Sequence, residues 1–248
     1  MTLSEFFRKH PKAAIAFSGG VDSAYLLSEA IRNGADIRAY FVKTPFQPQF
    51  ELDDARKLAA ELNTDMTVIE LNILNVPNVS ENPPDRCYHC KKAMLSAIAK
   101  AAEKDGYPLL LDGTNASDSA ADRPGMIALK ELSFRSPLRE CGLTKPEIRS
   151  LSKETGLFTW NKPAYACLAT RIPCGEVITA EKLARTEAAE NALSSMGFSD
   201  FRARMQGDNA LLQFTEAQRE AALAQQEDIF TELRKYYSDI TIDSEVRK

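Results

Sequence analysis

Short apolar runs alternate with segments of helical periodicity along the first two thirds of the chain. Buried strands are predicted at 13–17 (AAIAF), 37–42 (IRAYFV), 65–71 (DMTVIEL) and 109–111. Helices are predicted at 23–33, 51–62 and 90–104, and the Asn- and Pro-rich stretch 72–85 is predicted to be a loop. Strands that alternate with helices are typical of a parallel sheet with helices on both faces. We therefore expect an α/β fold.

The pattern changes near Thr179. It predicts a helix at 180–196, a hairpin of strands 201–206 and 210–214, a long helix at 216–236 and a strand at 240–242. The turn signal of the hairpin is Gly207-Asp208-Asn209. We expect an α/β domain at 1–160, a cysteine-bearing connection at 161–178, and a small C-terminal α+β domain at 179–248.

Composition narrows the class of protein. The 248 residues are 44% hydrophobic and 27% charged, as in ordinary globular domains. The formal net charge of -4 offers no surplus of positive charge for a nucleic-acid backbone. We expect no signal peptide, because no long apolar stretch precedes the first predicted strand, and no apolar run approaches the roughly 18–20 residues that would cross a bilayer. We expect a cytoplasmic protein that binds neither membranes nor nucleic acid.

The sequence SGGVDS at 18–23 lies where the first predicted strand meets a helix. Gly19 and Gly20 let the backbone approach a ligand closely, and the N–H groups of the following helix favour an anion. Ser18 and Ser23 add hydroxyl donors, whereas Asp22 would repel a phosphate unless Mg²⁺ joined the two. No lysine follows the glycines, so this is not a Walker loop. The motif resembles the PP-loop of ATP pyrophosphatases, in which ATP is the expected nucleotide.

Further sequence blocks follow in order along the chain. They read LDGTNASD at 111–118, RPG at 123–125, SPL at 136–138, TKPEIR at 144–149 and KPAYACLATR at 162–171. Together with SGGVDS, this combination resembles the LarE family of ATP-dependent sacrificial sulfur transferases. The resemblance covers most of the chain.

The resemblance implies a specific reaction. ATP adenylylates a carboxylate of pyridinium bis-carboxylic acid mononucleotide, and a cysteine thiolate displaces AMP. The carbon–sulfur bond of that cysteine then breaks, which leaves a thiocarboxylate on the substrate and dehydroalanine in the protein. The thiolated nucleotide later becomes the nickel-pincer cofactor of lactate racemase. The matching cysteine here is Cys167. We expect a homo-oligomer that hands its product to other proteins of cofactor biosynthesis.

Cysteine spacing leaves a second route open. Cys87 and Cys90 form a CxxC motif, which with Cys167 and Cys174 could supply four metal ligands if their loops converge. Three of these thiolates could instead hold an iron–sulfur cluster that provides the sulfur. Cys167 and Cys174 are therefore candidate catalytic residues, and Cys87 and Cys90 candidate metal ligands. Cys141 lies between the blocks and is interpreted as incidental.

Several polar residues are candidates for binding. Gly113, Thr114 and Asn115 follow a predicted strand end, where ligands of open parallel sheets lie. Asp118 is a candidate partner of Mg²⁺ or substrate, and Arg123 a candidate phosphate ligand. Arg202 and Arg204 alternate along a strand and so share one face, which suits a phosphate or carboxylate.

Two further residues qualify this substrate site. Arg171 is a candidate substrate ligand that would also lower the pKa of the Cys167 thiol if the loop folds back. The family often has a carboxylate late in the second hairpin strand, where this chain has Gln213. A metal-binding role for that position is therefore in doubt.

Other functions share the phosphate loop. A tRNA thiolase of the PP-loop class would need a basic surface, and an amide-forming ligase would not require Cys167. A module that binds ATP without turnover is the alternative outside enzymes. Release of pyrophosphate distinguishes such a module from the LarE-type sulfur transferase, the tRNA thiolase and the amide-forming ligase.

Overall fold

The computed structural model of the protein describes residues 1–118 and 124–247. The chain divides into two compact units. The first comprises Met1–Val76 and Asp85–Lys162, and the second comprises Pro77–Pro84 and Pro163–Lys248. The stretch Pro77–Pro84 thus leaves the first unit and belongs to the second.

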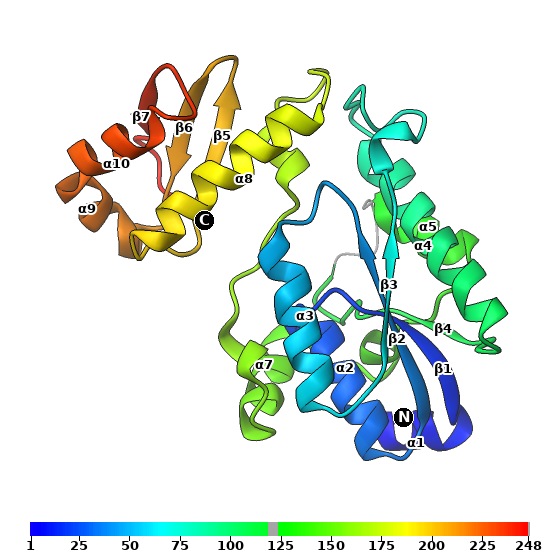
Figure 1. Cartoon of the computed structure of the whole chain (residues 1–248). Coiled ribbons are helices and arrows are strands. Elements are labelled where there is room, and N and C mark those ends of the chain that lie inside the picture. The colour runs from blue at the N-terminus through cyan, green and yellow to red at the C-terminus, as the bar shows by residue number, and fades with distance from the viewer. Residues whose placement is uncertain (119–123, 248) are drawn as a thin grey trace. The chain divides into compact units, whose positions relative to one another are not determined.

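The first unit is built on a parallel sheet. Its described strands are β1 (Lys12–Ala16), β2 (Asp36–Lys43), β3 (Met66–Glu70) and β4 (Leu110–Leu111), in the order β3-β2-β1-β4 (Figure 1). All the pairs are parallel, which requires crossover connections and explains the helices between the strands. The predicted α/β fold is confirmed.

Helices cover both faces of this sheet, with α2 and α3 on one side and α4 and α5 on the other (Figure 1). Side chains alternate along the strands, so Ala13 and Ile15 pack in one core and Ala14 in the other. The helices of this unit are α1 (Leu3–Lys9), α2 (Val21–Arg32), α3 (Gln49–Glu61), α4 (Arg86–Lys104), α5 (Pro124–Glu131), α6 (Pro137–Glu140) and α7 (Lys145–Glu154). Short 3-10 turns occur at Ile73–Asn75 and Phe158–Asn161.

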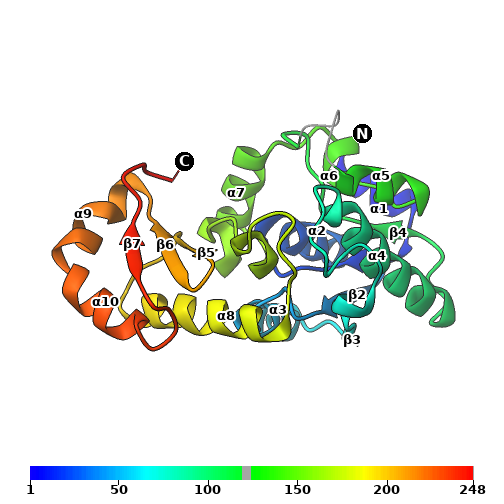
Figure 2. The same ribbon diagram turned by 90° about the horizontal axis from the view of Figure 1, so that it is seen from above.

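The second unit packs helices against a small mixed sheet. Strands β5 (Arg202–Gln206) and β6 (Asn209–Gln213) form the predicted hairpin, and β7 (Ile240–Ile242) runs parallel to β6 (Figure 2). The remaining elements are the 3-10 turn η3 (Leu168–Arg171) and helices α8 (Ala180–Ser195), α9 (Glu216–Ala224) and α10 (Gln226–Leu233). The predicted α+β appendage is therefore observed.

The structure corrects two predicted helices. The single helix predicted at 216–236 is two helices that meet at Gln225, whose φ of -104° departs from helical geometry. Glu227 and Asp228 follow directly, and carboxylates of this kind stabilise a new helix N-terminus. The helix predicted from residue 90 begins at Arg86, so Cys87 and Cys90 both lie on its first turns.

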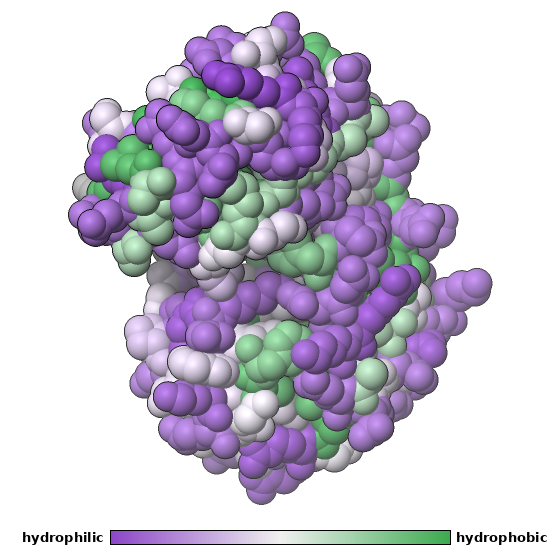
Figure 3. All heavy atoms as spheres, turned by 60° about the vertical axis from the view of Figure 1, so that its left-hand side comes forward, coloured by the Kyte–Doolittle hydropathy of each residue, from purple (hydrophilic) through white to green (hydrophobic). Residues whose placement is uncertain are grey.

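The face of the molecule in Figure 3 is largely polar. It shows mostly hydrophilic residues, with hydrophobic residues in small groups between them. Among the helices of the described ranges, none combines the length and apolar character that spanning a membrane requires.

Candidate functional site

The phosphate loop turns tightly around the hydroxyl of Ser23. Ser23 Oγ accepts a hydrogen bond from the backbone N of Ser18 at 3.2 Å and donates to the carbonyl of Gly20 at 3.2 Å. It also lies 3.1 Å from Ser18 Oγ. Gly20 is the N-cap of α2, and no side chain caps that helix. The amide groups at the start of α2 are thus presented to an anion, as the sequence predicts.

Two glycines are required by close packing around this loop. Gly19 has a φ of +70°, and a Cβ there would lie 3.2 Å from Cβ of Ala55. A Cβ on Gly113 would lie 2.9 Å from the backbone N of Ser23, a distance that real Cβ atoms essentially never show. Gly113 therefore lets the end of β4 pack directly against the first turn of α2.

Asp22 forms an ion pair with a residue that the sequence analysis missed. Its Oδ2 lies 2.6 Å from Nζ of Lys145, and its Oδ1 accepts a hydrogen bond from Nδ2 of Asn115 at 3.3 Å. Asn115 is buried, whereas Asp22 and Lys145 keep part of their side chains in solvent. Lys145 therefore brings a cation to a loop whose own motif contains none.

The position of Lys145 is fixed by the backbone around it. Its N–H donates to Ser117 Oγ at 2.9 Å, and Ala116 N donates to the carbonyl of Leu143 at 2.7 Å. Thr144 and Glu147 form a capping box at the start of α7. The T-x-x-E pattern at 144–147 could have revealed the helix start, but no local signal pairs Lys145 with Asp22.

The segment after β4 is held by its own carboxylates. The hydroxyl of Thr114 donates to the buried Asp112, which also accepts from Ser136 Oγ at 2.5 Å. Asp118 Oδ2 accepts from the backbone N of Asn115 at 3.0 Å. Thus Gly113, Thr114, Asn115 and Asp118 lie at the phosphate loop or support it. Arg123 lies outside the described residues.

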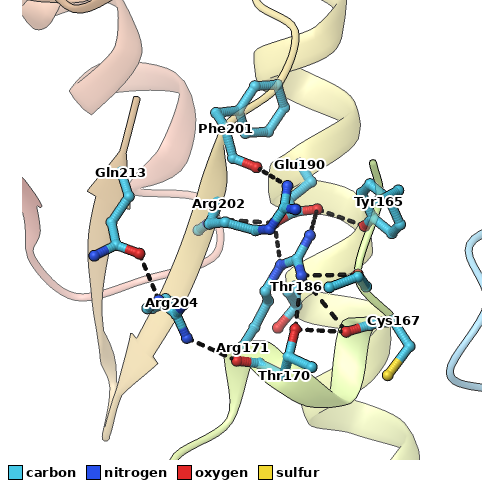
Figure 4. Close-up of polar contacts among 12 residues, drawn as sticks. Tyr165, Cys167, Thr170, Arg171, Thr186, Glu190, Phe201, Arg202, Arg204 and Gln213 are labelled. Atoms are coloured by element: carbon cyan, nitrogen blue, oxygen red, sulfur yellow. Dashed lines mark hydrogen bonds and ion pairs between the residues drawn. The ribbon is translucent and has the colours of Figure 1, made fainter. Parts of the chain in front are cut away.

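Cys167 lies at the start of a tight turn in the second unit (Figure 4). It is the N-cap of η3, and its carbonyl accepts from Thr170 N at 2.9 Å and Thr170 Oγ1 at 2.8 Å. Nη1 of Arg171 donates to the carbonyl of Ala166 at 2.8 Å. The backbone at the predicted reactive cysteine is therefore rigidly held, and the Cys167 side chain is half-buried.

Arg171 and Glu190 form a buried ion pair beneath this turn. Their side chains are 0% and 5% exposed, and the guanidinium meets the carboxylate at 2.7 Å and 3.0 Å. Tyr165 donates to the same carboxylate at 2.5 Å, and Ala203 N donates to it at 3.0 Å. The loop does fold back to Arg171, but Glu190 compensates the charge of this arginine locally. The sequence offers no signal for Glu190, which lies in an unremarkable helix.

Arg202 and Arg204 differ in their surroundings. Arg202 is buried and donates to the carbonyls of Phe201 at 2.7 Å and Ala164 at 3.0 Å. Burial and the neighbouring charge of Arg171 lower its pKa. Arg204 is exposed and donates to Gln213 Oε1 at 2.5 Å and to the carbonyl of Thr170 at 2.9 Å (Figure 4).

The other candidate cysteines lie in different parts of the chain. Cys87 and Cys90 belong to the first unit, and Cys174 belongs to the second. The thiol of Cys174 donates to the carbonyl of the buried Asn82 at 3.4 Å, and Asn82 in turn holds the carbonyl of Pro173 at 2.7 Å. In the two described ranges, no cluster of three or more His, Cys, Asp or Glu residues is arranged to hold a metal ion. Cys141 packs at the margin of the first core, where burial raises its pKa.

Comparison with known proteins identifies relatives along nearly the whole chain. The chain is 37% identical over 215 residues to an uncharacterised protein of Synechocystis, which covers 85% of this chain and 79% of that protein. It is 33% identical over 218 residues to the pyridinium-3,5-bisthiocarboxylic acid mononucleotide synthase of Lactiplantibacillus plantarum, with 87% and 79% covered. A probable tRNA sulfurtransferase of Thermoanaerobacter is 22% identical and covers 76% of this chain but 52% of its own length. No protein-family model matches.

The parallel sheet and the SGGVDS loop at its first strand–helix junction define an α/β protein of the PP-loop class. The two relatives with a named activity are a mononucleotide synthase and a probable tRNA sulfurtransferase, and the chain is an enzyme. At 33% identity over 87% of its length to a curated member, the chain belongs to the LarE family.

Proposed function

We propose that this protein uses ATP to activate a carboxylate of pyridinium bis-carboxylic acid mononucleotide and converts it to a thiocarboxylate. The observation that carries the proposal is the match to the Lactiplantibacillus plantarum synthase, which spans both units. The phosphate loop supports it, because the uncapped start of α2 and the cation of Lys145 suit a triphosphate. When Mg²⁺ is bound, Asp22 is the carboxylate that would hold it.

The residues of the two units would divide the work. In the first unit, the amides at the start of α2 and Lys145 bind and orient the phosphates of ATP, so that the substrate carboxylate displaces pyrophosphate. In the second unit, the Cys167 thiolate attacks the acyl-adenylate and AMP leaves. Loss of the Cα proton of Cys167 then breaks its Cβ–S bond, which leaves dehydroalanine and the thiocarboxylate.

The alternative source of sulfur would be an iron–sulfur cluster held by three of the thiolates of Cys87, Cys90, Cys167 and Cys174. The two routes differ in what happens to the protein. Sacrifice lowers the mass of the chain by H₂S at Cys167 and allows each chain a single turnover, whereas the cluster route leaves the chain unchanged. Mass spectrometry after a single turnover therefore distinguishes them.

The experiment that tests the proposal measures pyrophosphate and thiocarboxylate from ATP, Mg²⁺ and the mononucleotide. We expect Asp22→Ala to abolish pyrophosphate release, and Cys167→Ser to abolish thiocarboxylate while pyrophosphate is still formed. Asp65→Ala, an exposed aspartate outside the loop, and Cys141→Ser are matched controls with unchanged activity. The proposal is wrong if the wild-type protein forms no pyrophosphate with this substrate.

A tRNA thiolase is the second candidate, because the Thermoanaerobacter protein matches at 22% identity. The net charge of -4 disfavours it, since RNA binding relies on basic side chains. Pyrophosphate release that depends on tRNA and not on the mononucleotide would favour this candidate.

A further inference from the structure

A line of polar contacts joins the end of β7 to the turn that follows Cys167. Asp243 Oδ2 accepts from Nε2 of Gln213 at 2.8 Å, and Gln213 Oε1 accepts from Nε of Arg204 at 2.5 Å. Nη1 of Arg204 donates to the carbonyl of Thr170 at 2.9 Å. Thr170 in turn holds the carbonyl of Cys167, so the line ends at the candidate nucleophile (Figure 4).

The chemistry of the two ends fixes the direction of this line. A guanidinium can only donate hydrogen bonds and an ionised carboxylate can only accept them. The amide of Gln213 therefore must turn its oxygen to Arg204 and its nitrogen to Asp243, since the flipped amide would lose both contacts. The hydrogen bond from Gln213, followed by one from Glu245 N, lowers the pKa of Asp243, so the carboxylate stays ionised at neutral pH.

Asp243 is itself held by the backbone. Its N–H donates to the carbonyl of Leu212 at 2.8 Å, and its Oδ1 accepts from Glu245 N at 3.1 Å. A glutamate at position 213 would place a second carboxylate against Asp243, and like charges at that distance repel. A glutamine avoids this repulsion, and its side-chain oxygen still accepts a hydrogen bond from Arg204.

Arg204 differs from Arg171 and Arg202 in the number of its N–H groups that remain available to a ligand. Arg171 is 0% exposed and Arg202 is buried, and both Nη atoms of each donate to protein oxygens. Arg204 is exposed and donates through Nε and Nη1, while its Nη2 has no hydrogen-bond acceptor among the residues that the structure describes. Of these three guanidiniums, Arg204 is the one that offers a fixed N–H group to an anion.

We propose that Asp243 is a positioning residue which, through Gln213, fixes Arg204 to bind the phosphate of the mononucleotide substrate beside Cys167. The identity of the ligand rests on the proposed function. The fixed orientation of the Arg204 guanidinium is independent of that function, because it follows from the hydrogen bonds alone. A pre-oriented arginine loses less side-chain entropy when it binds a phosphate, so the benefit is in substrate affinity.

The test is a double-mutant cycle on Asp243→Ala and Gln213→Ala, with two readouts: the maximal single-turnover rate, and the mononucleotide concentration that gives half of it. Loss of one charge-assisted hydrogen bond corresponds to about a tenfold change, so we expect each single variant to raise the half-saturating concentration about tenfold with the maximal single-turnover rate nearly unchanged. Because both residues act through one contact, the double variant should be no worse than Gln213→Ala. Asp243→Asn, which keeps an acceptor oxygen, should fall between wild type and Asp243→Ala.

A second readout does not depend on turnover. Hydrogen exchange of the Arg204 Nε–H, followed by NMR, should accelerate in Asp243→Ala and in Gln213→Ala but not in Ser244→Ala, an exposed neighbour of Asp243. Unchanged exchange in Asp243→Ala would overturn the positioning role, and so would increases in the half-saturating mononucleotide concentration that multiply in the double variant. If the wild-type protein does not turn over the mononucleotide, the proposed function fails while the exchange measurement still decides the role of Asp243.

Discussion

The phosphate loop of the first unit and the Cys167 turn of the second are both tight chain reversals, but they are stabilised in different ways. The phosphate loop relies on backbone groups, two serine hydroxyls and glycines that permit close approach. The Cys167 turn rests on the buried pair of Arg171 and Glu190. The loop can exchange its outer contacts for a ligand, whereas the turn cannot change without leaving a buried charge unpaired.

The two sites therefore differ in function: the phosphate loop is suited to binding a ligand, and the Cys167 turn is suited to holding a rigid backbone. The charges at the phosphate loop, Asp22 and Lys145, are partly exposed and form an ion pair with each other. Those beneath Cys167 are out of solvent and make all of their contacts with the protein. A site that must bind and release a triphosphate needs partly exposed charges such as Asp22 and Lys145. A site that must hold a nucleophile in place needs buried, fully paired charges such as Arg171 and Glu190.

The largest effect is expected from Glu190→Gln. The substitution leaves the buried guanidinium of Arg171 without a compensating charge, which costs about 3–5 kcal/mol in the free energy of unfolding. Denaturant unfolding of the protein measures it. The matched control is Glu181→Gln, an exposed glutamate on the same helix, for which we expect a change within about 0.5 kcal/mol. Equal stability of the two variants would contradict the comparison.

Gly113→Ala should disturb the phosphate loop without affecting the second unit. The new Cβ would meet the backbone of Ser23 and displace the first turn of α2, and a shift of about 1 Å can reduce catalysis about a hundredfold. Pyrophosphate release measures the loss. Gly125→Ala is the control, because its Cβ meets only the flexible side chain of Lys91. Normal activity of Gly113→Ala would show that the close approach is not needed.

Lys145→Met should have the smallest of the three effects. Removing one charge-assisted contact to phosphate corresponds to about a tenfold rise in the ATP concentration that half-saturates the single-turnover rate, with little loss of stability because the Asp22 pair is partly exposed. Lys130→Met, an exposed lysine of the same unit, should leave this concentration unchanged. An unchanged half-saturating concentration in Lys145→Met would mean that the lysine only neutralises Asp22.

The fold and the phosphate loop could be predicted because their signals are local. Apolar runs and helical spacing predict β1, α2 and β2, and SGGVDS carries its own geometry in six residues. The T-x-x-E pattern at Thr2–Glu5 is also local and would have predicted α1, whose capping box is present.

The rest depends on residues that are distant in sequence. Lys145 reaches Asp22 across 123 positions, and Asp243 reaches Gln213 across 30. Periodicity and propensity carry no information on such pairs, because they result from packing of complete elements. The break at Gln225 was missed for a related reason, since 216–236 is helical in composition on both sides of it.

The interruption of the first unit by Pro77–Pro84 has a consequence for how the protein is made. On the ribosome this stretch emerges early, but Ile172, Pro173 and Ile178, whose backbone groups it bonds, are synthesised about 90 residues later. The second unit therefore cannot be completed from the C-terminal half of the chain alone. A gene fragment that begins at Pro163 would encode Cys174 without Asn82, so it would lack part of the second unit.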